Sequence, residues 1–161
     1  MHLKVRPVSL SALVVAALVV AVGSSFAQSG DPLHGTWKLD IAKSTFSPGP
    51  APKATNLKYE PAGDRLRVIV DVENEKGKAH WEYTAGFDGK EQAVTGNPEV
   101  DLVSLKRIGP ATTEASFKKG GKPTTTNTRV VSPDGKTLTI TIKGTNAQGQ
   151  AVHNVQVYDK Q

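Results

Sequence analysis

The sequence contains no cysteine. This excludes a disulfide, a thiolate metal site, thiol catalysis and a cysteine-linked lipid anchor. Aromatic residues are also scarce, at 6% of the chain, and there is a single methionine. Among exported proteins, a chain without disulfides is typical of the bacterial envelope or of bacterial secretion. Without covalent cross-links, the folded domain of this chain must be stabilised by one hydrophobic core.

Long hydrophobic runs are absent apart from one at the N-terminus. His2, Lys4 and Arg6 precede an apolar run over residues 8–22, and the small residues of Ser25-Phe26-Ala27 follow it. This order predicts a signal peptide over residues 1–27, cleaved after Ala27. The alternative is an uncleaved anchor, but a spanning helix needs ~20 apolar residues. We expect a periplasmic or secreted bacterial protein with one mature domain, residues 28–161, and no stable membrane anchor after cleavage.

The chain also lacks a concentrated basic region. Its formal net charge is +5, and removal of Lys4 and Arg6 with the leader lowers this to +3. The remaining lysines are scattered among the turns, and only Lys118-Lys119 and Lys106-Arg107 are adjacent basic pairs. Nucleic-acid binding favours a basic stripe with interleaved aromatic residues. We therefore expect no nucleic-acid partner, and we expect a monomer.

No segment beyond the leader has a sustained helical period. Apolar residues alternate instead with polar ones, most clearly over residues 66–72 and 137–142, as in half-buried strands. Turn signals separate these runs at intervals of ~8–12 residues, which indicates an all-β sandwich or barrel. The candidate strands cover residues 34–40, 54–60, 65–73, 78–86, 90–95, 100–107, 112–118, 123–131, 136–143 and 150–158.

Glycine-containing turns join most of these strands, with Asp134-Gly135 after Pro133 the strongest. Short turns between successive strands predict an antiparallel meander, and about ten strands in one small domain favour closure into a barrel. A Greek-key sandwich is the main rival. It needs long crossovers, and only the proline-rich connection over residues 42–53 is long.

Two ends of the mature sequence resemble the lipocalins and fatty-acid-binding proteins. Gly35-Thr36-Trp37-Lys38-Leu39 resembles their opening strand, and Val157-Tyr158-Asp159-Lys160 is similar to the closing strand of the fatty-acid-binding proteins. The stretch from Asp88-Gly89-Lys90 to Arg107 also resembles small exported bacterial proteins that are described as lipocalin-like. The resemblance implies an antiparallel ten-stranded barrel that binds a small apolar ligand and is not an enzyme.

The sequence departs from the fatty-acid-binding proteins in two places. Their helical lid is replaced by the proline-rich loop, which cannot form two helices. Gln156 stands where that family has an arginine that grips the ligand carboxylate. Lipocalins usually place an arginine near the end of the last strand to pack on the motif tryptophan. No arginine follows Arg129, so that place is left unfilled or taken by Lys160.

The inward-facing polar and aromatic residues are the candidates for ligand contact. Trp81 and Tyr83 share one face of their strand, where they either line a pocket or belong to the core. Gly35 and Trp37 are expected to be structural and to close one end of the barrel. The tentative ligand-binding residues are Trp81, Tyr83, Arg129, Gln156 and Tyr158.

No motif for a serine nucleophile, a phosphate loop or a metal site is present, so we expect no catalytic residue, no metal and no cofactor. Two alternatives to a ligand-binding barrel remain open. One is a ligand-free interaction or inhibitor module that uses the exposed Ser44–Lys53 loop in the cell envelope. The other is a haem-binding barrel that uses His153.

Overall fold

The computed structural model describes residues 30–161, so the expected signal peptide lies outside the described residues. Those residues form ten strands and no helix. The strands are β1 (Gly35–Thr45), β2 (Ala54–Ala62), β3 (Arg65–Asn74), β4 (Gly77–Ala85), β5 (Gln92–Ala93), β6 (Leu102–Gly109), β7 (Thr112–Lys119), β8 (Lys122–Val131), β9 (Thr137–Thr145) and β10 (Ala151–Lys160).

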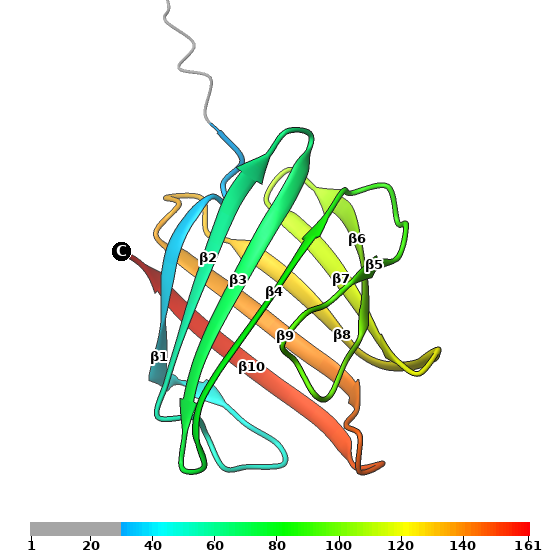
Figure 1. The fold of residues 1–161 in the computed structure, drawn as a ribbon. Coiled ribbons are helices and arrows are strands. Elements are labelled where there is room, and N and C mark those ends of the chain that lie inside the picture. The colour runs from blue at the N-terminus through cyan, green and yellow to red at the C-terminus, as the bar shows by residue number, and fades with distance from the viewer. Residues whose placement is uncertain (1–29) are drawn as a thin grey trace, which may run out of the picture.

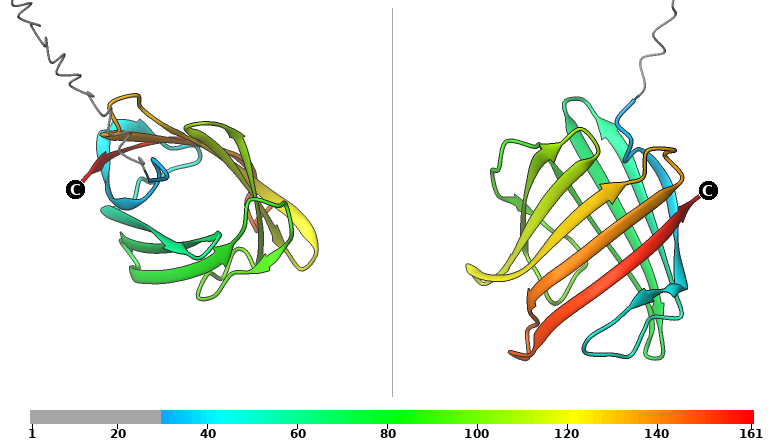
Figure 2. Two further views of the ribbon diagram at one scale, coloured as in Figure 1. Left: turned by 90° about the horizontal axis from the view of Figure 1, so that it is seen from above. Right: turned by 180° about the vertical axis from the view of Figure 1, so that it is seen from behind.

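The strands form one antiparallel sheet in the order β4-β3-β2-β1-β10-β9-β8-β7-β6-β5. Neighbouring strands are also consecutive in sequence, with one exception. The pairing of β1 with β10 joins the first strand to the last. The sheet curls into a nearly closed barrel, with β2–β4 on one side and β7–β10 on the other (Figures 1 and 2). The predicted antiparallel meander barrel of about ten strands, without a helical lid, is confirmed.

The barrel closes between β4 and the segment that follows β5. Glu82 and Thr95 exchange both backbone hydrogen bonds, each with an N···O distance of 2.9 Å. Gly96 comes next and has φ +86°, and a Cβ atom there would lie 2.4 Å from the carbonyl oxygen of His80. Only glycine permits this close approach of the two backbones.

One end of the barrel is filled by side chains. This end lies beside the entry of the N-terminal segment, at the top of Figure 1. Its residues come from six strands and from the segment before β1, and the period-2 pattern of each strand turns its member inward. Seven of them are at most 2% exposed: Leu33, Trp37, Leu66, Ala85, Leu105, Val131 and Leu138.

Gly35 and Trp37 of β1 lie at this end of the barrel. The Trp37 side chain is fully buried, and its indole N–H donates to the carbonyl oxygen of Leu33 at 2.8 Å. The Lys160 ammonium lies 5.0 Å from the Trp37 ring centroid. Lys160 thus takes the place on the tryptophan that an arginine occupies in lipocalins. A Cβ atom on Gly35 would lie 2.9 Å from Cε of Lys160, so the glycine makes room for this contact.

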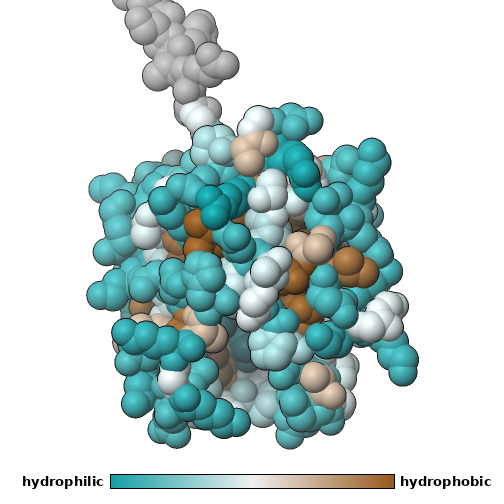
Figure 3. Space-filling model, in the orientation of Figure 1, coloured by the Kyte–Doolittle hydropathy of each residue, from teal (hydrophilic) through white to brown (hydrophobic). Residues whose placement is uncertain are grey.

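The strand predictions differ from the structure mainly at two places. The expected strand over residues 90–95 is reduced to Gln92–Ala93, because this segment bridges the closing gap of the barrel. β1 extends five residues beyond the expected boundary, with a register irregularity between Asp40 and Thr45. The face of the molecule seen in Figure 3 is mainly hydrophilic, with small separate apolar patches. None of the described residues belongs to a helix long and apolar enough to cross a membrane.

Candidate functional site

The other half of the barrel contains a cavity of about 340 Å³. Its wall is formed by inward-facing residues of β2–β4 and β8–β10, and its roof by the proline-rich loop after β1. A volume in this range is typical of small-molecule sites. The barrel is therefore filled at one end and hollow at the other.

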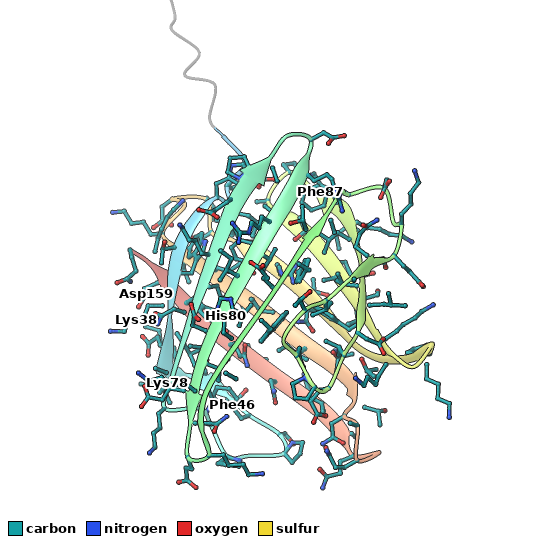
Figure 4. All side chains as sticks on the ribbon, viewed as in Figure 1. Lys38, Phe46, Lys78, His80, Phe87 and Asp159 are labelled. Atoms are coloured by element: carbon teal, nitrogen blue, oxygen red, sulfur yellow. The ribbon has the colours of Figure 1, made fainter. Side chains whose placement is uncertain are left out.

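The roof is held by contacts with β10 and with the barrel interior. The Ser47 N–H donates to the side-chain oxygen of Asn154 at 2.8 Å, and the Ser47 carbonyl accepts from the His153 N–H at 2.7 Å. Phe46 packs against the core, and it lies near the lower ends of β3 and β4 (Figure 4). Pro48, Pro50 and Pro52 also line the cavity, so the loop presents an apolar underside to it.

Arg129 is the most unusual residue of the cavity wall. Its side chain is 3% exposed, and its Nη2 donates to the Tyr83 hydroxyl at 2.8 Å. Its Nε and Nη1 are buried and have no hydrogen-bond partner. No carboxylate among residues 30–161 forms a salt bridge with it. A buried cation without a counter-ion is costly to the fold, which makes this guanidinium a candidate ligand contact.

Tyrosine hydroxyls surround this cation. Burial raises the pKa of Tyr59 to about 12, although the nearby Arg129 charge acts in the opposite direction. Burial likewise raises the pKa of Tyr83 and Tyr158. All three phenols are therefore neutral at physiological pH. Burial opposes the charge on Arg129, but its interactions with the tyrosines raise its pKa, and the guanidinium stays positive.

The cavity wall formed by β8, β9 and β10 carries polar groups in two rows. In the first row, the register aligns Arg129 of β8 with Ile140 of β9 and Gln156 of β10. The second row lies two residues from the first on each strand. In it, Ile142 of β9 pairs with Asn127 of β8 and with Asn154 of β10. Each β9 isoleucine is thus flanked by a polar side chain on both sides.

The opposite wall is mainly apolar, although Thr55, Asn74 and Glu75 also line the cavity from this side. β2 contributes Leu57, and β3 contributes the alternating residues Val68, Val70 and Val72. Trp81 of β4 extends this wall. The ring of Trp81 stacks on Tyr83 with centroids 6.1 Å apart and meets Phe117 edge-on at 6.2 Å. The cavity therefore has one polar wall and one aliphatic and aromatic wall.

A second space of about 320 Å³ adjoins the cavity on the side of β7 and the β9–β10 turn. Both spaces share four lining residues, namely Trp81, Asn127, Ile142 and Asn154. The Oδ1 atom of Asn127 is buried and has no hydrogen-bond partner within the described residues. Polar atoms without a partner are thus concentrated along the inner face of β8.

The structure brings four of the five predicted ligand-binding residues to the cavity: Trp81, Arg129, Gln156 and Tyr158. Tyr83 does not line it. This residue is 3% exposed within the core, and its hydroxyl orients Arg129 instead. The two aromatic residues of β4 therefore differ in role. Trp81 lines the cavity, whereas Tyr83 belongs to the core.

The alternative of haem binding through His153 is not supported by the geometry. His153 is exposed and lies between the inward-facing Asn154 and Val152, so its side chain is on the outer face of β10. His80 is likewise on the outside, paired with Asp71 at 2.7 Å (Figure 4). The described residues contain no cluster of three or more His, Asp or Glu side chains able to hold a metal ion.

Sequence reasoning missed Asn127, Asn154 and Tyr59 as lining residues. A signal was present for the two asparagines. Asn127 precedes Arg129 by two residues and Asn154 precedes Gln156 by two, so each shares the inward face of a residue that was predicted. Tyr59 gave no comparable signal, because its neighbours across the barrel come from distant strands.

Comparisons with known proteins agree with this architecture. No protein-family model matches the sequence, and no curated protein matches it. Among solved structures, the chain is similar to a Schistosoma mansoni fatty acid binding protein in complex with arachidonic acid, at 13% identity and a TM-score of 0.54, over 81% of this chain and 96% of the other. It is also similar to a zebrafish ileal bile acid-binding protein complexed with cholic acid, at 14% identity and a TM-score of 0.50, over 81% and 99% of the two chains. The chain therefore has the calycin fold, a barrel of the lipocalin and fatty-acid-binding-protein type.

Proposed function

We propose that this protein is an exported, non-enzymatic barrel that binds a small apolar molecule carrying an anionic group. The observation that carries the proposal is Arg129, which lines the cavity and has a buried guanidinium with no counter-ion among residues 30–161 and with two nitrogen atoms that lack a hydrogen-bond partner. A ligand carboxylate would supply the missing counter-ion and accept charge-assisted hydrogen bonds. The apolar remainder of the ligand would be buried against the aliphatic wall.

The similar structures support the same class of function. Their names describe a fatty acid binding protein in complex with arachidonic acid and a bile acid-binding protein complexed with cholic acid, and both ligands are carboxylic acids. In this chain Gln156 of β10 stands where the fatty-acid-binding proteins have an arginine. The cation of the proposed site is Arg129, which comes from β8. Export follows from the signal peptide expected over residues 1–27. N-terminal sequencing of the periplasmic or secreted protein should begin at Gln28.

The proposal is tested with decanoate and decanol, which share an apolar chain and differ in charge. Wild-type protein should bind decanoate more tightly, as measured by calorimetry. Arg129→Met should weaken decanoate binding about 10- to 100-fold and leave decanol binding nearly unchanged, because a hydrogen-bonded charge is lost and the apolar surface is kept.

Arg67→Met is the matched control, because Arg67 is on the outer face and pairs with Glu82 at 2.7 Å. It should leave both affinities unchanged. Arg129→Met should also fold, since it removes a buried charge that has no counter-ion. The proposal fails if folded wild-type protein binds neither compound, or if Arg129→Met weakens decanol and decanoate equally.

A further inference from the structure

The cavity has to be reached from the hollow end of the barrel, because side chains fill the other end. Figure 1 shows two connections at the hollow end, with the proline-rich roof to the left and the β9–β10 turn to the right. The route of a ligand depends on which of these connections is held more weakly by the rest of the barrel.

The roof is fastened along its whole length. The Ser47 N–H and carbonyl both hydrogen-bond to β10, at 2.8 and 2.7 Å. Where the roof begins, the Ser44 hydroxyl accepts from a backbone N–H of β10 at 2.9 Å. Where it ends, the Lys53 N–H donates to the Glu73 carbonyl at 2.8 Å. Phe46 also packs against the core, so opening the roof would break several contacts together.

The second space beside the cavity extends from the barrel interior to the surface. Its lining includes Val100 and Phe117, which are buried, as well as Glu99, Thr145 and Ala147, which are exposed. This space shares four lining residues with the cavity. It therefore lies between the solvent and the cavity.

The mouth of this second space is bounded by the loop of residues 96–100 and by the β9–β10 turn, residues 146–150. Within the described part of the chain, one hydrogen bond joins these two segments. The Ala147 N–H donates to the Glu99 Oε2 atom at 3.3 Å, and the pair is exposed to solvent. A long hydrogen bond at the surface contributes little to stability, so the mouth is held more weakly than the roof.

Each side of the mouth is held separately. Thr95 exchanges backbone hydrogen bonds with β4 just before the loop, and the Asp101 carboxylate accepts from the Gly120 N–H at 2.8 Å just after it. In the turn, the Asn146 side-chain oxygen accepts from the Gln150 N–H at 2.9 Å. The two segments can therefore separate without unfolding, because only the bond between them has to break.

We infer that ligands enter and leave the barrel through this mouth while the roof stays closed, and that the Glu99–Ala147 hydrogen bond is the latch of the entrance. The inference rests on the proposed function, because it assigns a route to the same cavity. Glu99 acts on the rates of binding and not on the affinity, since the latch can close again once the ligand is inside.

Two double variants test the route. The chain has no cysteine, so each variant carries two thiols only. In Glu99→Cys/Ala147→Cys a short bismaleimide can bridge the mouth, and in Ser47→Cys/His153→Cys the same reagent can bridge the roof to β10. All four replaced residues are exposed and therefore open to the reagent. The unbridged form of each variant is its own control.

The readout is the association and dissociation of decanoate and decanol, followed by stopped-flow tryptophan fluorescence, because Trp81 lines both spaces. Bridging the mouth should slow both rates at least about tenfold for both compounds, because the segments can no longer separate. Bridging the roof should leave the rates unchanged.

Glu99→Ala tests the latch without a cross-link. It should raise both rates about 2- to 10-fold and leave the affinity unchanged, because one exposed hydrogen bond is lost. Glu91→Ala is the matched control, since it removes a carboxylate from the same connection between β4 and β6, where Glu91 pairs with Lys118. It should leave the rates unchanged. An equal effect of Glu99→Ala on neutral decanol would exclude a purely electrostatic cause.

The outcomes separate this inference from the proposed function. If the roof bridge slows binding as much as the mouth bridge, or if the mouth bridge has no effect, the assigned entrance is wrong while an apolar acid-binding barrel stands. If Glu99→Ala leaves the rates at the wild-type values, the latch is wrong. If neither decanoate nor decanol binds to the folded protein, both the inference and the proposed function fall.

Discussion

At the scale of single residues, Arg129 and the tyrosines beside it combine groups that a stable core would avoid. The guanidinium is buried and has no carboxylate partner within residues 30–161, and its only hydrogen bond goes to Tyr83. Tyr59 and Tyr158 are also buried next to it. The proposed function accounts for this cluster as a ligand contact, because replacing a buried unpaired charge by an apolar side chain usually stabilises a fold.

The alkaline stability of the protein should report on these phenols. The pKa of Tyr59 is about 12 in the folded state, against an ordinary value of 10. The unfolded chain therefore loses its proton first, and the stabilisation present below pH ~10 is lost as the pH rises toward 12. Tyr59→Phe should reduce this loss by about 1.4 kcal/mol per pH unit.

The measurement is the free energy of unfolding in urea at pH values from about 8 to 11.5. Below pH ~10 the curves of wild-type protein and Tyr59→Phe should run parallel, and above it they should diverge. If the free energy of unfolding had the same pH dependence in wild-type protein and Tyr59→Phe over the whole range, the Tyr59 hydroxyl would ionise as readily in the folded protein as in the unfolded chain.

At the scale of elements, the strands were predictable from the sequence because alternation and turn glycines are local properties. The β9 pattern of Leu138, Ile140 and Ile142 requires no knowledge of the neighbouring strands. β5 was overestimated, because its pairing depends on where β4 arrives from the other side of the barrel. The cavity was not predictable for the same reason, since its depth depends on how far the distant side chains fill the interior.

The joint between β4 and the segment after β5 provides a test of barrel closure. Gly96→Ala would place a Cβ atom 2.4 Å from the His80 carbonyl oxygen at a residue with positive φ. We expect it to destabilise the fold by about 1–3 kcal/mol and to loosen this edge. Gly49→Ala, where nothing lies within 4 Å, is the control and should change stability little.

Hydrogen exchange followed residue by residue should locate the effect of Gly96→Ala at Glu82 and Thr95, whose amides form the closing pair. A variant with wild-type stability and wild-type protection of these two amides would show that the two backbones can separate without cost.

At the scale of the whole molecule, the barrel is divided into a filled half and a hollow half. Leu138 and Ile142 are on the same face of β9, but Leu138 is 0% exposed in the core and Ile142 lines the cavity. Leu138→Ala should cost about 2–5 kcal/mol of stability, because it opens a new void. Ile142→Ala enlarges an existing space and should cost clearly less.

Urea unfolding of the two variants measures this difference. Ile142→Ala should instead change the affinity for bound acids, because Ile142 lies in the cavity wall between Asn127 and Asn154. Equal destabilisation by both variants would mean that the two halves are packed alike, which contradicts a cavity under the proline-rich roof.

The contacts at the closed end have a practical consequence for orientation. The Gln161 N–H donates to the Thr36 carbonyl at 2.9 Å, and Arg107 pairs with Asp31, so both described ends of the chain are tied to the half opposite the roof. A protein immobilised on a sensor through a tag after Gln161 would therefore turn its hollow half and the proline-rich roof away from the support. Tethering would leave this half of the barrel facing the flowing solution.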